Sequence, residues 1–231
     1  LPDPYPDSDG KPMADNTLQY QWIVRLVTNL RHLLKNQTAF VAGDLLWYPT
    51  ETPFPAPAQA PDVLVALGRP PGDRGSYKQW QEDNIAPQVI FEILSPSNTG
   101  SEMAAKQTFY IQHGVLEMFF YDPQSFSFWG LVRTHPQDTP QPLMALQLPW
   151  TSPTLGIRLE MGTEGLAVFY PNGEPFKAPE ELAAERDQIT AQLAQTSQQL
   201  EQTSQQLEQT SHDRDRAFAK LRELGIDPAT L

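Results

Sequence analysis

Cysteine is absent from the 231 residues of this chain. Its absence excludes disulfide bonds, thiolate-bound zinc, iron–sulfur clusters and a cysteine nucleophile, and it is consistent with a reducing compartment. No apolar run approaches the roughly 18–20 residues that a membrane span requires, and no stretch near the beginning resembles a signal peptide. We therefore expect a soluble, cytoplasmic protein that does not enter a membrane.

Basic residues are scarce. Lys and Arg number 16 against 28 Asp and Glu, which gives a net charge of −12. The deficit holds in residues 1–179, with 18 acidic and 11 basic side chains, and in residues 180–231, with 10 and 5. Because non-specific DNA binding depends on a basic surface, this charge opposes tight unaided binding to DNA.

The first 178 residues contain the signals of a mixed α/β domain. Helical spacing of apolar residues predicts a helix that begins with a cap at Asp15 or Asn16 and ends near Asn36. Thr99 and Glu102 have capping-box spacing for a second helix that runs to about His113. Short apolar runs bounded by turn residues predict strands at residues 39–47 (a pair or one bent strand), 62–67, 88–94, 116–121, 126–133, 143–148, 156–159 and 167–170.

Residues 179–231 contain a short sequence repeat in place of the strand and helix signals of the first 178 residues, and we expect them to form a separate tail. The segment Gln-Thr-Ser-Gln-Gln-Leu-Glu recurs on a seven-residue period, which places Leu193, Leu200 and Leu207 in register. A period of seven predicts a left-handed coiled coil. The second seam is rich in Thr, so a single helix that frays remains an alternative to self-association.

Glu92 is a carboxylate inside an otherwise apolar strand. Burial of an ionised Glu costs several kcal/mol unless it is paired or bound to a metal. Asp62 opens the other apolar strand, so neighbouring strands would bring the two acids together as ligands for Mg²⁺. The alternatives are structural: Asp62 as a turn cap after Pro61, and Glu92 in an ion pair with Arg31, Arg74 or Lys106.

Six short motifs are spread over residues 5–175. They are DGKPMA at 9–14, VAGDLLWYP at 41–49, APDV at 60–63, IAPQVIFEILSPSN at 85–98, Lys106-x-x-x-Tyr110-x-x-x-Gly114-Val115-x-Glu117, and YDP at 121–123. Together they resemble the motifs of the Uma-two family, whose members are described as restriction endonucleases. That family is abundant in cyanobacteria and belongs to the PD-(D/E)XK nuclease superfamily.

The resemblance implies a restriction-endonuclease-like mixed sheet flanked by helices, with Asp62 and Glu92 as the two metal-binding acids. The superfamily would place a Lys two positions after the second acid, but this chain has Leu94 there. The resemblance therefore implies that Lys106 on the following helix acts instead, although an i,i+4 pair with Glu102 is the structural alternative. Ser95 and Asp44 are possible auxiliary residues, with strand termination and a turn as their other roles.

The leading hypothesis is a DNA endonuclease that uses Mg²⁺ or Mn²⁺ to hydrolyse phosphodiester bonds through an activated water molecule. Cutting both strands requires two sites, so we expect a homodimer formed through the core or the coiled coil. The alternative is a catalytically silent nuclease fold that works as an interaction protein through its coiled coil. The acidic charge and the missing Lys at position 94 motivate that alternative.

Overall fold

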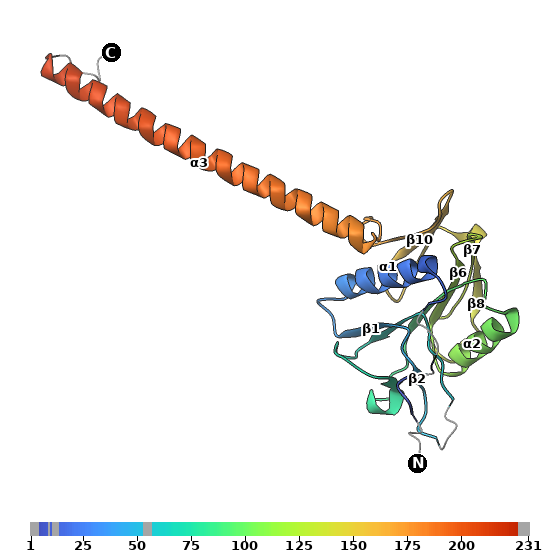
Figure 1. Cartoon of the computed structure of the whole chain (residues 1–231). Helices are drawn as coiled ribbons and strands as arrows, with labels where there is room; N and C mark the ends of the chain where they lie inside the picture. Colours follow the sequence, from blue (N-terminus) through green and yellow to red (C-terminus); the bar gives the residue numbers. More distant parts are fainter. Residues whose placement is uncertain (1–4, 9, 11–13, 53–56, 226–231) are drawn as a thin grey trace. The chain divides into compact units, whose positions relative to one another are not determined.

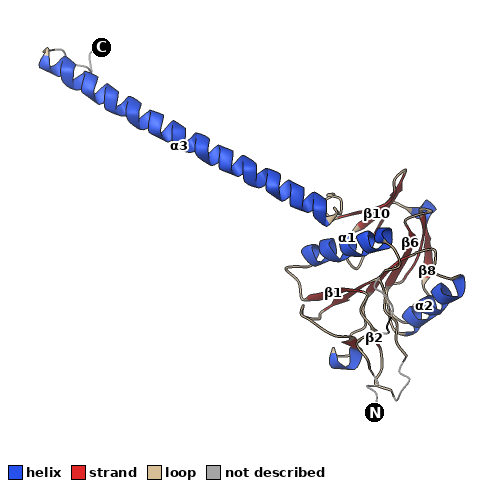
Figure 2. Cartoon of the chain, viewed as in Figure 1, coloured by secondary structure: helices blue, strands red, loops and turns tan. Residues whose placement is uncertain are grey.

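The computed structural model describes residues 5–8, 10, 14–52 and 57–225. Positions 9 and 11–13 of the N-terminal motif lie outside this part. The chain divides into two compact units, Leu1–Pro179 and Glu180–Leu231. The first is a mixed α/β domain in which helices flank a six-stranded sheet (Figures 1 and 2). The predicted fold class is confirmed.

The central sheet has the strand order β1-β3-β5-β6-β7-β8. Only the β5–β6 pair is parallel; the other neighbours in this sheet are antiparallel. A parallel pair needs a crossover connection, and helix α2 provides it. The strands of this sheet are β1 (Ala39–Gly43), β3 (Val63–Leu67), β5 (Val89–Ile93), β6 (Glu117–Asp122), β7 (Ser127–Val132) and β8 (Gln141–Met144).

Helix α1 (Thr17–Leu33) covers one face of the sheet. The Asn16 side chain accepts a hydrogen bond from the Gln19 N–H and so caps its first turn. Its apolar residues recur at helical spacing and are buried against β3 and β5. A small sheet of β9 (Trp150–Thr151), β10 (Arg158–Gly162) and β11 (Gly165–Phe169) adds apolar side chains to the same core. The α1 residues of this core are Trp22, Ile23, Leu26 and Leu30.

We expect Asn16→Ala to lower the free energy of unfolding of the domain by about 1 kcal/mol, because the Gln19 N–H loses its acceptor. Urea denaturation of the full chain measures the change. Gln21→Ala, at an exposed position of the same helix, is the control and should alter stability by less than about 0.5 kcal/mol. Equal effects of the two substitutions would contradict the capping role.

Helix α2 (Gly100–Gln112) packs on the opposite face of the sheet. The Thr99 side chain accepts from the Glu102 N–H at 3.2 Å, which confirms the predicted start of the helix. Side chains alternate along each strand, so β5 directs Phe91 and Ile93 to the α1 side and Ile90 to the α2 side. This second core also holds a parallel pair, β2 (Trp47–Tyr48) with β4 (Tyr77–Lys78), through Trp47 and Tyr77.

The strand predicted at residues 143–148 is wrong over most of its length. Strand β8 ends at Met144, and a 3-10 helix, Ala145–Gln147, follows. The Gln147 side chain accepts from the Met144 N–H at 2.7 Å. This local bond competes with a strand ladder and turns the chain. Other strands also differ from the prediction: β10 begins and ends later, β11 begins and ends earlier, and the two-residue strands β4 and β9 were not predicted.

The main element of the second unit is helix α3 (Pro179–Glu223), which has 45 residues and begins at the last residue of the first unit. None of its described side chains is buried. The leucines of the seven-residue repeat are therefore exposed along a helix that continues through the whole repeat. Within the described residues, no helix is both long enough and apolar enough to cross a bilayer.

Candidate active site

The antiparallel pairing of β3 with β5 brings Asp62 beside Glu92. Val63 lies opposite Phe91 in this register, and one further step places Asp62 opposite Glu92. The Ile93 N–H donates to Asp62 Oδ2 at 2.6 Å across the two strands. Both side chains are buried, with 8% and 2% of Asp62 and Glu92 exposed. The two acids are therefore neighbours at one end of paired strands, as their positions predicted.

Both carboxylate oxygens of Glu92 accept hydrogen bonds from helix α2. Lys106 Nζ lies 2.8 Å from Glu92 Oε2, and the Tyr110 hydroxyl donates to Oε1. Lys106 Nζ also donates to the Ala60 carbonyl at 3.4 Å. Of the three partners weighed for Glu92, the structure selects Lys106.

Helix geometry explains why Lys106 and Tyr110 converge on one carboxylate. Residues four apart lie on the same face of a helix, one turn from each other. Met103 and Phe109 are buried in the core below and fix the rotation of α2 over the sheet. The Lys106 stem is largely covered, and 13% of its side chain remains exposed. The ammonium group is therefore fixed between Glu92 and the Ala60 carbonyl.

Asp62 is protonated more readily than an ordinary aspartate. Burial, and then the like charge of Glu92, raise the pKa of Asp62 to about 8. Lys106, the Ile93 N–H and the Gln19 side chain oppose this increase. Gln19 Nε2 also donates to the Ile93 carbonyl at 2.8 Å. Helix α1 therefore reaches the site through Gln19, the third residue after its cap.

Lys106 and Tyr110 keep their protons at neutral pH. Burial alone would lower the pKa of Lys106, but the charges of Glu92 and Asp62 and the hydrogen bond to Glu92 raise it above its ordinary value. Burial, together with the charge of Glu92, raises the pKa of Tyr110 well above its ordinary value. At neutral pH the site therefore contains an ammonium group and a neutral phenol as donors.

We expect the metal-free protein to lose stability as the pH rises from about 4 to about 8. In this window folded Asp62 holds a proton that the unfolded chain has released, so a higher pH favours unfolding. The change should be on the order of a few kcal/mol, since one pKa unit corresponds to about 1.4 kcal/mol. Denaturant unfolding of the wild type and of Asp62→Asn, with a chelator present, measures it. An equally steep pH dependence in Asp62→Asn would contradict the raised pKa.

The two auxiliary candidates lie at the edge of this group. Ser95 Oγ donates to Asp15 Oδ2 at 2.5 Å and lies 2.8 Å from Ser97 Oγ, so it ties the end of β5 to the start of α1. Asp44 has a left-handed backbone conformation with φ 47°, and its N–H donates to the Asp62 carbonyl at 3.2 Å. Both positions agree with the structural alternatives, strand termination for Ser95 and a turn for Asp44.

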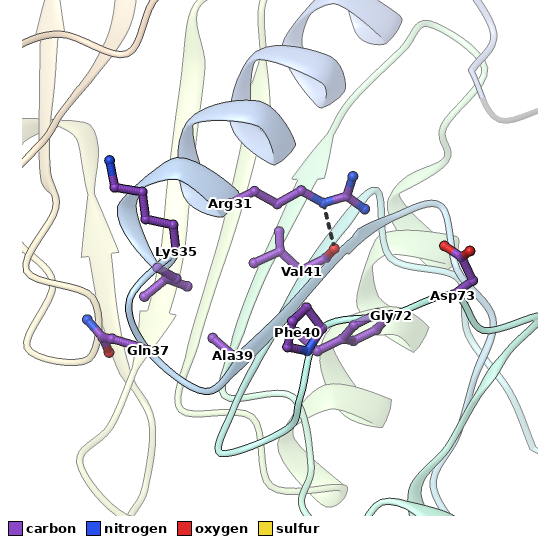
Figure 3. A pocket seen from close by; sticks show the side chains of 10 residues that line it. Arg31, Lys35, Gln37, Ala39, Phe40, Val41, Gly72 and Asp73 are labelled. Atoms are coloured by element: carbon purple, nitrogen blue, oxygen red, sulfur yellow. Dashed lines mark hydrogen bonds between the residues drawn. The ribbon is translucent and has the colours of Figure 1, made fainter.

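Arg31 and Arg74 serve other parts of the domain. Arg31 Nε donates to the Val41 carbonyl at 3.1 Å, along a pocket of about 320 Å³ between α1 and β1 (Figure 3). Arg74 Nε lies 2.5 Å from Glu82 Oε1 and so fastens the long connection between β3 and β5. Neither arginine is a partner of Glu92 among the described contacts.

Sequence reasoning assigned no role to Tyr110 or Gln19. Tyr110 carried a usable signal, because it follows Lys106 by four residues and therefore shares its helix face. Gln19 carried none. Only the packing of α1 on the sheet reveals that it reaches the Ile93 carbonyl, 74 positions further along the chain.

The donor atoms fit a hard divalent cation that prefers oxygen ligands. Asp62 and Glu92 offer carboxylate oxygens, and Ile93, the residue after Glu92, offers a main-chain carbonyl. A carboxylate oxygen or a carbonyl has two lone pairs, so the hydrogen bonds described above leave further acceptor capacity. Mg²⁺ is often bound by one or two carboxylates, with water in its remaining positions. The described residues contain no cluster of three or more His, Asp or Glu side chains suited to a metal.

The chain matches the model of a known protein family over most of its first unit. The model of the Uma2 family, described as "Putative restriction endonuclease", matches residues 10–168. The chain belongs to the Uma2 family. The match includes Asp62, Glu92 and Lys106 and ends before α3, and it confirms the resemblance found in the motifs.

Among solved structures, this Uma2 chain is similar to a crystal structure from Anabaena variabilis that is described as "a putative nuclease belonging to DUF820". The two are 17% identical, with a TM-score of 0.44, and the likeness covers 64% of this chain and 81% of the other. No curated protein matches the sequence.

Proposed function

We propose that this protein is a DNA endonuclease that depends on Mg²⁺ or Mn²⁺ and whose active site is built on Asp62 and Glu92. The observation that carries the proposal is the burial of Asp62 and Glu92 side by side, with Lys106 in contact with Glu92 and its charge acting on Asp62. Ionisable groups are costly to bury, and strongly shifted pKa values concentrate at functional sites. Membership in a family described as restriction endonucleases gives independent support.

In this proposal Asp62, Glu92 and the Ile93 carbonyl hold the metal ion. When bound, the ion supplies Lewis-acid stabilisation of phosphate charge and makes a water molecule a stronger nucleophile. A cation would also offset the repulsion between the two carboxylates, which contributes to the raised pKa of Asp62. Metal and proton therefore compete for Asp62, so metal affinity should increase with pH.

The remaining residues position and balance these groups. Lys106 supplies a fixed positive charge that can stabilise the negative charge developing on the scissile phosphate. Tyr110 orients the Glu92 carboxylate through Oε1, while Lys106 contacts Oε2. Gln19 holds the Ile93 carbonyl. In this proposal Lys106 of α2, which contacts Glu92, takes the role of the lysine that the superfamily places two positions after its second acid, where this chain has Leu94.

The experiment is cleavage of supercoiled, linear and single-stranded DNA by the purified full chain in Mg²⁺ or Mn²⁺. We expect cleavage that stops when a chelator is added. Because the chain carries a charge of −12, cleavage should require low salt. Calorimetry with Mn²⁺ in the absence of DNA measures metal binding separately.

Absence of cleavage from every DNA form, together with no binding of Mn²⁺, would refute the proposal. Binding of Mn²⁺ without cleavage would instead favour the second candidate, a silent nuclease fold that acts through its coiled coil. The acidic charge and the occupation of both Glu92 oxygens by Lys106 and Tyr110 favour that candidate. A chain truncated after residue 178 should then lose its partners, whereas Asp62→Asn should keep them.

A further inference from the structure

Helix α3 exposes large apolar side chains at regular intervals along its repeat. Ile189, Leu193, Leu200 and Leu207 are between 63% and 71% exposed. Such residues at seven-residue spacing are those that a coiled coil buries against a partner helix. The same period continues along the described helix as far as Leu182 and Leu221, so a partner helix of similar length would cover the seam.

The period divides the seam into two sets of positions. In heptad notation the first set occupies the a positions and the second the d positions, three residues later. The a positions are Arg186, Leu193, Leu200, Leu207, Arg214 and Leu221. The d positions are Leu182, Ile189, Thr196, Thr203, Thr210 and Ala217.

A parallel pair of α3 helices would conflict with this pattern. In parallel coiled coils each a residue contacts the same residue of the second helix, so Arg186 would meet Arg186 and Arg214 would meet Arg214. Two layers of the seam would then each contain two like charges, which repel at short range. Each of the three Thr layers would also contain two small polar side chains.

An antiparallel pair removes both conflicts. In this orientation an a residue lies opposite a d residue of the second helix. If Leu200 lies opposite Thr203, the same register places Arg186 opposite Ala217 and Arg214 opposite Ile189. Both arginines of the seam then meet a small or apolar residue. The remaining layers pair Leu193 with Thr210, Leu207 with Thr196, and Leu182 with Leu221.

The residues beside the seam select the same register. Positions just before each a residue face one another in an antiparallel pair, and this brings Glu185 opposite Lys220 of the second helix. On the other flank, Phe218 lies opposite Ala183. A shift of seven residues keeps most Leu–Thr layers but separates Glu185 from Lys220. Charge complementarity therefore distinguishes one register among those that the repeat allows.

We propose that α3 binds α3 of a second copy of this chain as an antiparallel two-stranded coiled coil, with its symmetry axis between Leu200 and Thr203. The proposal does not depend on the nuclease activity. It makes the repeated segment of the tail the self-association surface and assigns Glu185 and Lys220 as the pair that sets the register.

Cross-linking of the full chain tests the orientation, and the absence of native cysteine makes single-cysteine variants specific. We expect a mixture of Leu193→Cys and Thr210→Cys to form a disulfide-linked pair under mild oxidation, and each variant alone to form little. Efficient cross-linking of each variant with itself would indicate a parallel pair and overturn the proposal. So would light scattering that gives the 26.0 kDa mass of one chain at every concentration tested.

A charge exchange tests the register. Glu185→Lys and Lys220→Glu should each weaken self-association about fivefold, because each creates two like-charge contacts in a symmetric dimer. The double variant should restore it. Glu201→Lys, on the outer face of the helix, is the matched control and should leave the dissociation constant unchanged. Failure of the double variant to recover, with the control unchanged, would refute this register.

Discussion

Glu92→Gln should reduce metal-dependent DNA cleavage by at least about 100-fold, since groups that only support metal ligands already contribute about 10- to 100-fold. Glutamine has the same size; its amide oxygen can accept from Lys106 and its amide nitrogen can donate to the Tyr110 hydroxyl oxygen, so the fold should persist. It lacks the charge that attracts a divalent cation. Initial rates of plasmid nicking, measured with Mn²⁺ at fixed pH, give the ratio to the wild type.

Glu117→Gln is the matched control for this substitution. Glu117 is fully buried on β6, the strand that neighbours β5, and accepts hydrogen bonds from Ser152 Oγ and the Thr154 N–H. Its environment is structural, so the folded variant should cleave at the wild-type rate. If Glu92→Gln also cleaves at the wild-type rate, the proposed site is wrong.

Among the substitutions considered for stability, Lys106→Met should cause the largest loss, about 3–5 kcal/mol in the free energy of unfolding. Glu92 is 2% exposed, and Lys106 is its cationic partner at 2.8 Å. Methionine can fill the space of the lysine stem but leaves the buried Glu92 carboxylate without a positive charge beside it. Guanidinium denaturation at neutral pH with a chelator present measures the loss.

Two variants separate the ion pair from a packing effect. Lys35→Met removes an exposed lysine and should change stability by less than about 0.5 kcal/mol. Lys106→Met combined with Glu92→Leu removes both charges and should recover most of the loss, because a buried pair can be replaced by apolar residues at little cost. A loss in Lys106→Met no larger than that of Lys35→Met would contradict a buried ion pair.

The sequence alone identified Asp62 and Glu92 as the acids of the site and located the two strands beside which or in which they lie. Glu92 was identifiable because a charge in an apolar strand requires a partner, and Thr99 identified the start of α2 through its capping spacing. These signals are local. The strand predicted at residues 143–148 failed for a local reason as well, because the Gln147 side chain bonds to the Met144 N–H and ends the strand.

Tertiary structure decided what the acids contact. The choice of Lys106 over Arg31 and Arg74 depends on how α2 packs across the sheet, and the contact of Gln19 with Ile93 joins α1 to β5. No periodicity records such contacts, because they depend on the distance between elements and on the rotation of each helix about its axis. The sequence therefore determined where charge had to be buried, and only the packing of two helices on opposite faces of one sheet decided how that charge is balanced.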